Sequence, residues 1–262
     1  MSHSPKSVLL LTGMHRSNTS FLAKTFQDAG LHIGHNLIPA DSYNREGHFE
    51  DEDFVQLHMY FIKKYKLKSR YSIVDYKKCR SLRVDHSDTT IAQKLIQQRH
   101  SVYDLFGWKD PRTCHFLTFW VKIIPNLKCV FIIRDPHVAV NSILKRHIER
   151  SKIKYRPDLW FRYHRFWQVC NQQILDFYKA HPDKSILIFT PDDILDSNAE
   201  AEISDTIIDN WKCDLKRIQL RKNYNKYLIT THQHNMPERI NQKSQKLYNE
   251  LNKLRSSERN KH

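Results

Sequence analysis

Glycine and long apolar segments are both scarce in this sequence. There are 5 glycines among 262 residues, and one of them, Gly13, lies in a polar loop close to the start. No run reaches the roughly 18 apolar residues that a membrane-spanning helix needs, and the apolar run 8–11 is too short for a signal peptide. We therefore expect a cytoplasmic protein without a membrane span, while a membrane-anchored enzyme that has lost its anchor stays open.

Metal-binding patterns are also lacking. The five cysteines form no C-x-x-C pair, and the 16 histidines form no H-x-x-x-H pattern on a predicted helix. An odd and unpatterned set of cysteines is typical of reduced thiols in the cytoplasm and argues against a zinc site. We therefore expect no metal. The cysteines are Cys79, Cys114, Cys129, Cys170 and Cys213.

Positive charge is what the sequence has in excess. Lysine and arginine number 43 against 28 acidic residues, which gives a net charge of +15 and favours anionic partners in general. The basic residues are spread out, with no zinc finger or RNA-binding aromatic pattern, so we expect no nucleic acid as partner. With 40% hydrophobic residues the chain is typical of globular proteins, and its length fits one domain over residues 1–262.

Short apolar runs alternate with helical periods along the chain. This alternation predicts an α/β fold, a three-layer P-loop-like arrangement with a central parallel β-sheet and helices on both faces. We expect a surface excursion at 66–88, irregular structure at 192–235, and an amphipathic C-terminal helix and tail at 237–262. The predicted strands are 8–11, 105–109, 128–133 and 185–189, and the predicted helices are 19–29, 51–65, 113–124, 138–147 and 158–181.

A polar loop between the first predicted strand and helix resembles a phosphate-binding loop. The frame G-x-x-x-x-G-K-[ST] fits at Gly13, which permits the turn, and at Ser20. Asn18 replaces the second glycine, Thr19 replaces the lysine, and the basic residue is Arg16 instead. Backbone N–H groups and a helix N-terminus still favour an anion here. We expect a nucleotide other than ATP or GTP.

A second candidate anion site follows the predicted strand 128–133. Arg134 lies at the carboxyl end of that strand, where a guanidinium can hold a phosphate with two hydrogen bonds. Ser142 lies about two turns into the following helix, within reach of the same anion. Taken alone, Arg134 and Asp135 are more simply explained as an ion pair at a helix start, but the first loop shifts the balance towards anion binding.

Together, the two motifs resemble the sulfotransferase family that uses 3′-phosphoadenosine 5′-phosphosulfate (PAPS), in its bacterial carbohydrate and tyrosine-sulfotransferase-like branch. In that family a G-x-x-R-[ST]-G-[ST]-[ST] loop cradles the 5′-phosphosulfate, and an Arg-x₇-Ser pair holds the 3′-phosphate. Asn18 departs from this pattern, but asparagine tolerates a left-handed backbone better than other non-glycine residues. The resemblance covers residues 7–150. It implies that the cofactor-binding residues are Gly13, His15, Arg16, Ser17, Asn18, Thr19, Ser20, Arg134 and Ser142.

The resemblance also implies catalytic residues. Lys109 begins a Lys-Asp-Pro segment that is similar to one in these relatives, where the lysine stabilises the transferring sulfonate; an ordinary surface pair with Asp110 is the alternative. Arg16 neutralises the leaving oxygen. A glutamate that follows the first helix is the base in the tyrosine sulfotransferases, and Glu50 is its candidate here. Acidic residues at a helix start also serve as caps, so three neighbours stay open as the base. They are Glu46, His48 and Asp51.

The function expected from the resemblance is transfer of a sulfonate group from PAPS to an acceptor hydroxyl, with adenosine 3′,5′-bisphosphate as product. We expect a carbohydrate acceptor, and the positive charge is compatible with an acidic glycan. A P-loop kinase or NTPase is the first alternative; it would need a lysine in place of Thr19 and an Mg²⁺-binding acid, for which Asp135 is the obvious candidate. A basic nucleic-acid-binding protein and a family member that binds nucleotide without turnover are further alternatives. The oligomeric state is not predicted.

Overall fold

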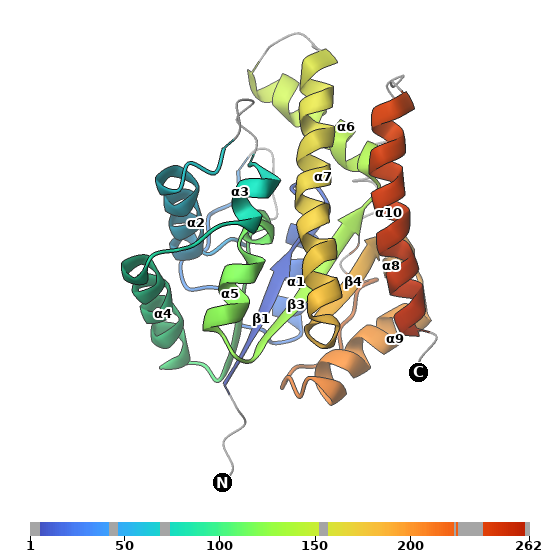
Figure 1. Cartoon of the computed structure of the whole chain (residues 1–262). Helices are drawn as coiled ribbons and strands as arrows, with labels where there is room; N and C mark the ends of the chain where they lie inside the picture. The colour runs from blue at the N-terminus through green and yellow to red at the C-terminus, as the bar shows by residue number, and fades with distance from the viewer. Residues whose placement is uncertain are drawn as a thin grey trace.

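Four parallel strands form the sheet at the centre of the molecule (Figure 1). The structure is a computed structural model that describes residues 6–41, 47–68, 74–151, 157–222, 224 and 238–259. The strand order is β2-β1-β3-β4, and all pairings are parallel. The four predicted strands are therefore confirmed. Their bounds are Ser7–Thr12 for β1, Leu105–Lys109 for β2, Leu127–Arg134 for β3 and Ser185–Thr190 for β4.

Helices cover both faces of this sheet. Because successive side chains of a strand point to opposite faces, Leu10 of β1 joins one buried cluster and Leu9 joins the other. The first cluster includes Trp167 of α7 and Leu251 of α10, which lie over one face, and the second includes Phe26 of α1 on the other face (Figure 1). Strands buried on both faces are mainly apolar, which is why the sequence revealed them. The predicted three-layer α/β fold is confirmed.

Most predicted helices are present with shifted ends. The predicted helix 113–124 is divided, because Phe116 has a φ of −124° and separates a 3₁₀ turn from α5. The helices of the first part of the chain are α1 (Thr19–Asp28), α2 (Glu52–Lys64), η1 (Pro111–His115) and α5 (Leu117–Ile123). Those of the second part are α6 (Pro136–Ser151), α7 (Pro157–Ala180), η2 (Pro182–Lys184) and α10 (Glu238–Arg259).

The prediction of irregular structure at 192–235 was wrong, because this range contains α8 (Asp192–Leu195), α9 (Ser197–Asp205) and the π-helical turn η3 (Thr206–Asn210). The range 66–88, expected as a surface excursion, contains α3 (Tyr76–Arg80) and the start of α4 (His86–His100). These helices bury few apolar side chains, so their periodicity is weak. Their aspartate N-caps, Asp75, Asp85 and Asp196, were the signal that could have revealed three of them.

The strand order places a topological switch point at the carboxyl ends of β1 and β3. From β1 the chain crosses to β2 on one side, and β3 lies on the other side of β1, so connections leave in opposite directions. Ligands of open α/β sheets bind at such a switch point. The loop after Thr12, the end of β2 at Lys109 and the end of β3 at Arg134 all lie at this edge. Within the described ranges, no helix combines the length and apolar character needed to cross a membrane.

Candidate functional site

Gly13 brings the first loop into close contact with β3. A Cβ atom at this position would lie 2.3 Å from the carbonyl oxygen of Ile132, closer than any side chain tolerates. The left-handed residues of the loop are instead Arg16, with a φ of 68°, and Asn18, with a φ of 65°. Our expectation that Gly13 permits the turn is therefore corrected: this glycine permits close packing against the strand.

Asn18 replaces a glycine without blocking the loop. Its backbone is left-handed, as expected for asparagine in this position, and its Nδ2 donates a hydrogen bond to Oγ1 of Thr190 at 3.1 Å, at the end of β4. The side chain therefore contacts β4 and makes no capping hydrogen bond to α1. The first N–H groups of α1, beginning at Thr19, are left for another acceptor. Ser17 and Thr19 are buried, and Ser20 donates to the carbonyl oxygen of His48.

The two predicted anion-binding motifs meet in space. Nε of Arg16 donates a hydrogen bond to Oγ of Ser142 at 2.9 Å, and Nη1 of Arg134 donates to the carbonyl oxygen of Arg16 at 2.8 Å. Trp167 fixes the strand end from α7, since its indole N–H donates to the carbonyl oxygen of Arg134 at 3.1 Å. Residues far apart in the sequence thus form one polar cluster at the carboxyl ends of β1 and β3.

This cluster has positive charge that is not neutralised. Burial and the neighbouring Arg16 lower the pKa of Arg134 to about 10, and burial together with Arg146 lowers the pKa of Arg16. Across the described parts of the chain, neither Arg16 nor Arg134 forms an ion pair with a carboxylate. Buried charges are costly without a counter-charge, so a bound anion would stabilise this cluster.

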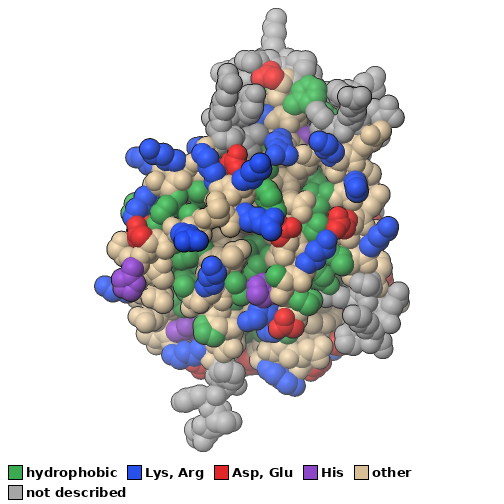
Figure 2. Space-filling view, viewed as in Figure 1, with side chains coloured by type: hydrophobic (Ala, Val, Ile, Leu, Met, Phe, Trp, Pro, Cys, Tyr) green, Lys and Arg blue, Asp and Glu red, His purple; other side chains and the backbone are tan. Residues whose placement is uncertain are grey.

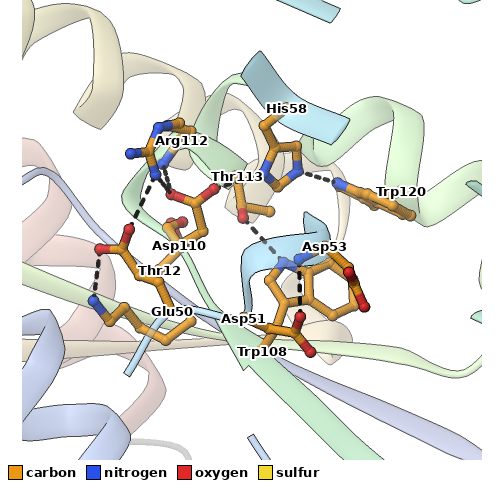
Figure 3. Close-up of polar contacts among 11 residues, drawn as sticks. Thr12, Glu50, Asp51, Asp53, His58, Trp108, Asp110, Arg112, Thr113 and Trp120 are labelled. Atoms are coloured by element: carbon orange, nitrogen blue, oxygen red, sulfur yellow. Dashed lines mark hydrogen bonds and ion pairs between the residues drawn. The ribbon is translucent and has the colours of Figure 1, made fainter. Parts of the chain in front are cut away.

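Glu50 and Lys109 form the second polar cluster. Figure 3 shows Glu50 with the neighbouring Asp110 and Arg112. Nζ of Lys109 lies 2.9 Å from Oε1 of Glu50, and Nη1 of Arg112 lies 3.1 Å from the other oxygen, Oε2. Glu50 is 7% exposed and Lys109 is 1% exposed. The structure therefore brings the two predicted catalytic residues into direct contact and adds Arg112, which the sequence reasoning did not single out.

Electrostatics keep Glu50 ionised in this arrangement. Burial raises the pKa of Glu50, but the charges of Lys109 and Arg112 oppose it, and the net pKa lies below its ordinary value. For Lys109 burial is the larger effect, and its pKa is lowered despite the carboxylate beside it. At neutral pH, Glu50 is thus a carboxylate with a cation on each oxygen.

The network continues from Arg112 to a buried histidine on α2. Nη1 of Arg112 also lies 2.6 Å from Oδ1 of Asp110, whose other oxygen, Oδ2, is 2.7 Å from Nδ1 of His58. The indole N–H of Trp120 points at Nε2 of His58 at 3.0 Å (Figure 3). Sequence reasoning missed His58, because it has the spacing of an ordinary core position of the helix. The Arg112 that ends the Lys-Asp-Pro-Arg segment was visible in the sequence.

The other described candidates for the base, Asp51 and His48, contact residues outside the second cluster. Asp51 accepts a hydrogen bond from the N–H of Asp53 as the N-cap of α2 and pairs with Arg99 at 3.0 Å, and it is fully buried. Nε2 of His48 lies 3.3 Å from Oδ2 of Asp41. Glu46 lies outside the described residues. Among the described candidates, only Glu50 contacts Lys109.

His15 lies between the two clusters. Its ring stacks on Phe166 of α7 with 5.8 Å between centroids. Burial, followed by the charge of Arg112, lowers the pKa of His15 to about 4, so the ring is neutral at neutral pH. Glu50 and Lys109 also act on its charge, which places this loop residue beside the second cluster.

Asp135, the acid that a kinase would need for Mg²⁺, already has hydrogen-bond partners in the backbone. Oδ1 of Asp135 accepts hydrogen bonds from the N–H groups of His137 and Val138 at 2.9 and 3.1 Å, so this carboxylate caps the start of α6. Thr19, in the place of the phosphate-loop lysine, is buried. Both features weigh against the kinase alternative.

A buried cysteine and histidine group lies beside the site. The ligand atoms of Cys114, His115 and Cys170 lie within 4.8 Å of one another. Structural zinc sites use four ligands, and within the described residues this group has three. Gln173 already contacts Nδ1 of His115 at 2.8 Å. Cysteine spacing did not reveal this group, because Cys114 and Cys170 are far apart in the sequence, but the group is one ligand short of a zinc site.

Comparison with known proteins identifies the fold. No protein-family model and no curated protein matches the sequence. The sulfotransferase domain from the curacin biosynthetic pathway is similar in structure, with a TM-score of 0.55 and 14% identity over 96% of this chain and 99% of that one. A sulfotransferase from Alicyclobacillus acidocaldarius gives a TM-score of 0.48 at 10% identity, over 98% and 96% of the chains. The first likeness shows that this chain has the fold of a sulfotransferase domain, in agreement with the resemblance seen in its motifs.

Proposed function

We propose that this chain belongs to the PAPS-dependent sulfotransferases and transfers a sulfonate group from PAPS to an acceptor hydroxyl. The observation that carries the proposal is the cluster of Arg16, Arg134 and Ser142 at the switch point of the sheet. A buried guanidinium group, Arg134, and a half-buried one, Arg16, have no carboxylate partner in the described part of the chain and favour a ligand with several negative charges. The shared fold supports the same assignment.

In this proposal the donor lies across the two motifs. The N–H groups of residues 16–20 and the hydroxyls of Ser17, Thr19 and Ser20 bind the 5′-phosphosulfate at the start of α1. Arg134 and Ser142 bind the 3′-phosphate. ATP lacks a 3′-phosphate, and the loop lacks the lysine that holds the β- and γ-phosphates of ATP, so the site discriminates against it.

The second cluster supplies the chemistry. Glu50 takes the proton of the acceptor hydroxyl. At the same time the hydroxyl oxygen forms a bond to sulfur, and the bond between sulfur and the phosphate oxygen of the donor breaks. Lys109 stabilises the charge on the sulfonate oxygens, and Arg16 neutralises the leaving phosphate oxygen. When Lys109 turns towards the sulfonate, Glu50 loses one of its two cations and its pKa rises. The carboxylate therefore becomes a stronger base once the donor is bound.

The acceptor in this proposal is a carbohydrate hydroxyl. The motif resemblance to carbohydrate sulfotransferases supports this class, and the net charge of +15 is compatible with an acidic glycan. The cations and N–H groups of the loop supply the charge that the transferring group needs, so the proposal includes no metal.

A transfer assay tests donor and acceptor together. PAPS that carries a radioactive sulfur is incubated with the protein and with pooled neutral glycans, acidic glycans or cell extract in parallel. We expect label in a glycan fraction with the wild-type protein and background label with Arg134→Ala. Label in a non-glycan fraction would contradict the carbohydrate acceptor and indicate another acceptor class. Background label in every fraction, from a protein that binds adenosine 3′,5′-bisphosphate, would indicate a nucleotide-binding protein without transferase activity.

A further inference from the structure

A buried histidine lies at the end of the network that holds Glu50. His58 is fully buried on α2, and its ring stacks on Phe116 with 4.9 Å between centroids and an angle of 3°. Burial is the largest influence on its pKa and lowers it, although Asp110 opposes the shift. The imidazole is therefore neutral at physiological pH and is fixed in one orientation.

Trp120 determines which nitrogen of His58 carries the proton. An indole N–H can only donate, so Nε2 of His58, at 3.0 Å from it, is an acceptor and carries no proton. The proton is on Nδ1, which donates to Oδ2 of Asp110 at 2.7 Å. Asp110 thus receives a hydrogen bond from a neutral donor, and Arg112 remains the cation that it contacts.

Asp110 in turn is held at both of its carboxylate oxygens. Oδ1 accepts from the backbone N–H of Arg112 at 2.9 Å and from Nη1 of the same residue at 2.6 Å, while Oδ2 accepts from His58. The hydroxyl of Thr12 donates to the backbone carbonyl of Asp110 at 2.8 Å, which ties the residue to β1. Nη1 of Arg112 is shared between Asp110 and Oε2 of Glu50, so the position of Asp110 fixes this cation on Glu50.

We propose that His58 is a positioning residue for Glu50, acting through Asp110 and Arg112. The inference rests on the proposed function, in which Glu50 is the base. With His58 as donor, Arg112 stays shared between the two carboxylates. Without it, Asp110 loses one of its hydrogen bonds and draws Arg112 away from Glu50.

The expected consequence is a change in the basicity of Glu50. The charged groups that face Glu50 are Lys109, Asp110 and Arg112, and the loop residue His15 lies beside them. Lys109 and Arg112 lower its pKa, whereas Asp110 raises it. Loss of the Arg112 contact therefore raises the pKa of Glu50 and leaves the carboxylate free to turn.

Two substitutions of His58 separate the hydrogen bond from the bulk of the ring. His58→Asn places an amide N–H close to the position of Nδ1, and His58→Leu fills the space without a donor. We expect His58→Leu to lower kcat by about 10- to 100-fold, because a misplacement of about 1 Å has effects of this size. Its KM for PAPS should be unchanged, and the acidic limb of its pH–kcat profile should move to higher pH. His58→Asn should retain most of the wild-type kcat, and its acidic limb should lie at the wild-type pH.

A matched control tests whether the effect is only a loss of stability. Phe61→Leu alters an equally buried ring on the same helix, outside the network. It should lower the melting temperature and leave the acidic limb in place. Equal losses of kcat in the Asn and Leu variants, or an unmoved limb in His58→Leu, would overturn the positioning role.

A spectroscopic measurement is independent of enzyme activity. Nitrogen-15 NMR of the wild-type histidines should show His58 as a neutral ring protonated at Nδ1 at physiological pH. A ring that is charged at this pH, or one protonated at Nε2, would overturn the inference. Failure of the wild-type protein to transfer sulfonate would instead contradict the proposed function and leave this spectrum unchanged.

Discussion

At the scale of single residues, the two clusters of the site have opposite charge imbalances. Arg134 is a buried cation and Arg16 is a half-buried one, and neither pairs with a carboxylate among the described residues, whereas Glu50 has a cation on each oxygen. The first arrangement favours binding of an anion. The second keeps a carboxylate unreactive until one of its cations is attracted elsewhere. On this difference we base the proposal that the first cluster binds the donor and that Glu50 of the second takes up the proton.

Removal of Arg134 tests the first role. We expect Arg134→Ala to weaken binding of adenosine 3′,5′-bisphosphate by roughly 10- to 100-fold, because a hydrogen bond to a charged group contributes about 1.5–3 kcal/mol. Titration calorimetry measures the change. Arg217→Ala is the matched control, since this arginine is 62% exposed and pairs with Asp205. Unchanged affinity in Arg134→Ala would remove Arg134 from the donor site.

Removal of the charge on Glu50 tests the second role. Glu50→Gln retains the shape of the side chain but cannot accept the acceptor proton, so turnover should fall by about 10²- to 10⁴-fold. Binding of adenosine 3′,5′-bisphosphate should stay within about twofold, because Glu50 lies outside the donor cluster. If turnover persists, the base lies elsewhere, and His48 is the next residue to replace.

At the scale of elements, the sequence predicted the strands from their apolar runs. It did not predict residue roles that depend on contacts between elements. The strands were predictable because their central residues, such as Val8–Leu11, are apolar and buried on both faces. Arg16 could be predicted as a candidate because it lies in the loop after the first strand, and Lys109 and Arg134 because they end the next two strands. His58 was not predictable in its role, because a core position on a helix gives no sign that its partner, Asp110, comes from another element.

The start of α2 shows the same limit. A cluster of acidic residues predicted a cap or a base without distinguishing between them. The contacts assign Asp51 to the cap and to Arg99, with the carboxylate fully buried, and assign Glu50 to Lys109. Two neighbouring carboxylates therefore have different roles, which their order in the sequence does not reveal.

Replacement of Asp51 tests this division. Asp51→Ala removes the helix cap and leaves Arg99 buried with a weaker partner, so the free energy of unfolding should fall by about 3–5 kcal/mol. Activity per folded molecule should be retained. Asp53→Ala is the control, because Asp53 is 49% exposed and its ion pair with Arg99 is worth under about 1 kcal/mol. A stable but inactive Asp51→Ala protein would identify Asp51 as the base.

At the scale of the whole molecule, positive charge is distributed over the surface. Lysine and arginine side chains are scattered over the face that carries α7 and α10, with acidic side chains among them (Figure 2). A net charge of +15 spread in this way attracts anions without directing them to one stripe of this face. In the proposed function, selectivity for the donor therefore depends on Arg16 and Arg134 at the carboxyl ends of β1 and β3.

Buried histidines make the fold sensitive to acid. Burial lowers the pKa of His15 to about 4 and, with His137, that of His164 to about 3; the pKa of His58 is lowered as well. The unfolded chain has histidine pKa values near 6.5, so below that pH it binds more protons than the folded state. Stability should therefore fall as pH decreases from about 6.5 towards 4.

Urea unfolding at about pH 7.5, 6 and 5 measures this dependence. The urea midpoint should decrease at each step, and His164→Gln should flatten the curve because one of the histidines that must stay neutral is gone. A midpoint that is constant or rises on acidification would show that these histidines do not control stability.

We propose that the carboxyl ends of β1 and β3 bind a nucleotide with a 3′-phosphate. Titration calorimetry of the wild-type protein with adenosine 3′,5′-bisphosphate, and separately with ATP and Mg²⁺, tests this proposal. We expect the bisphosphate to bind at least about 100-fold more tightly, which corresponds to the contribution of one additional charged contact. Tighter binding of ATP with Mg²⁺ would show that the site does not select a nucleotide with a 3′-phosphate.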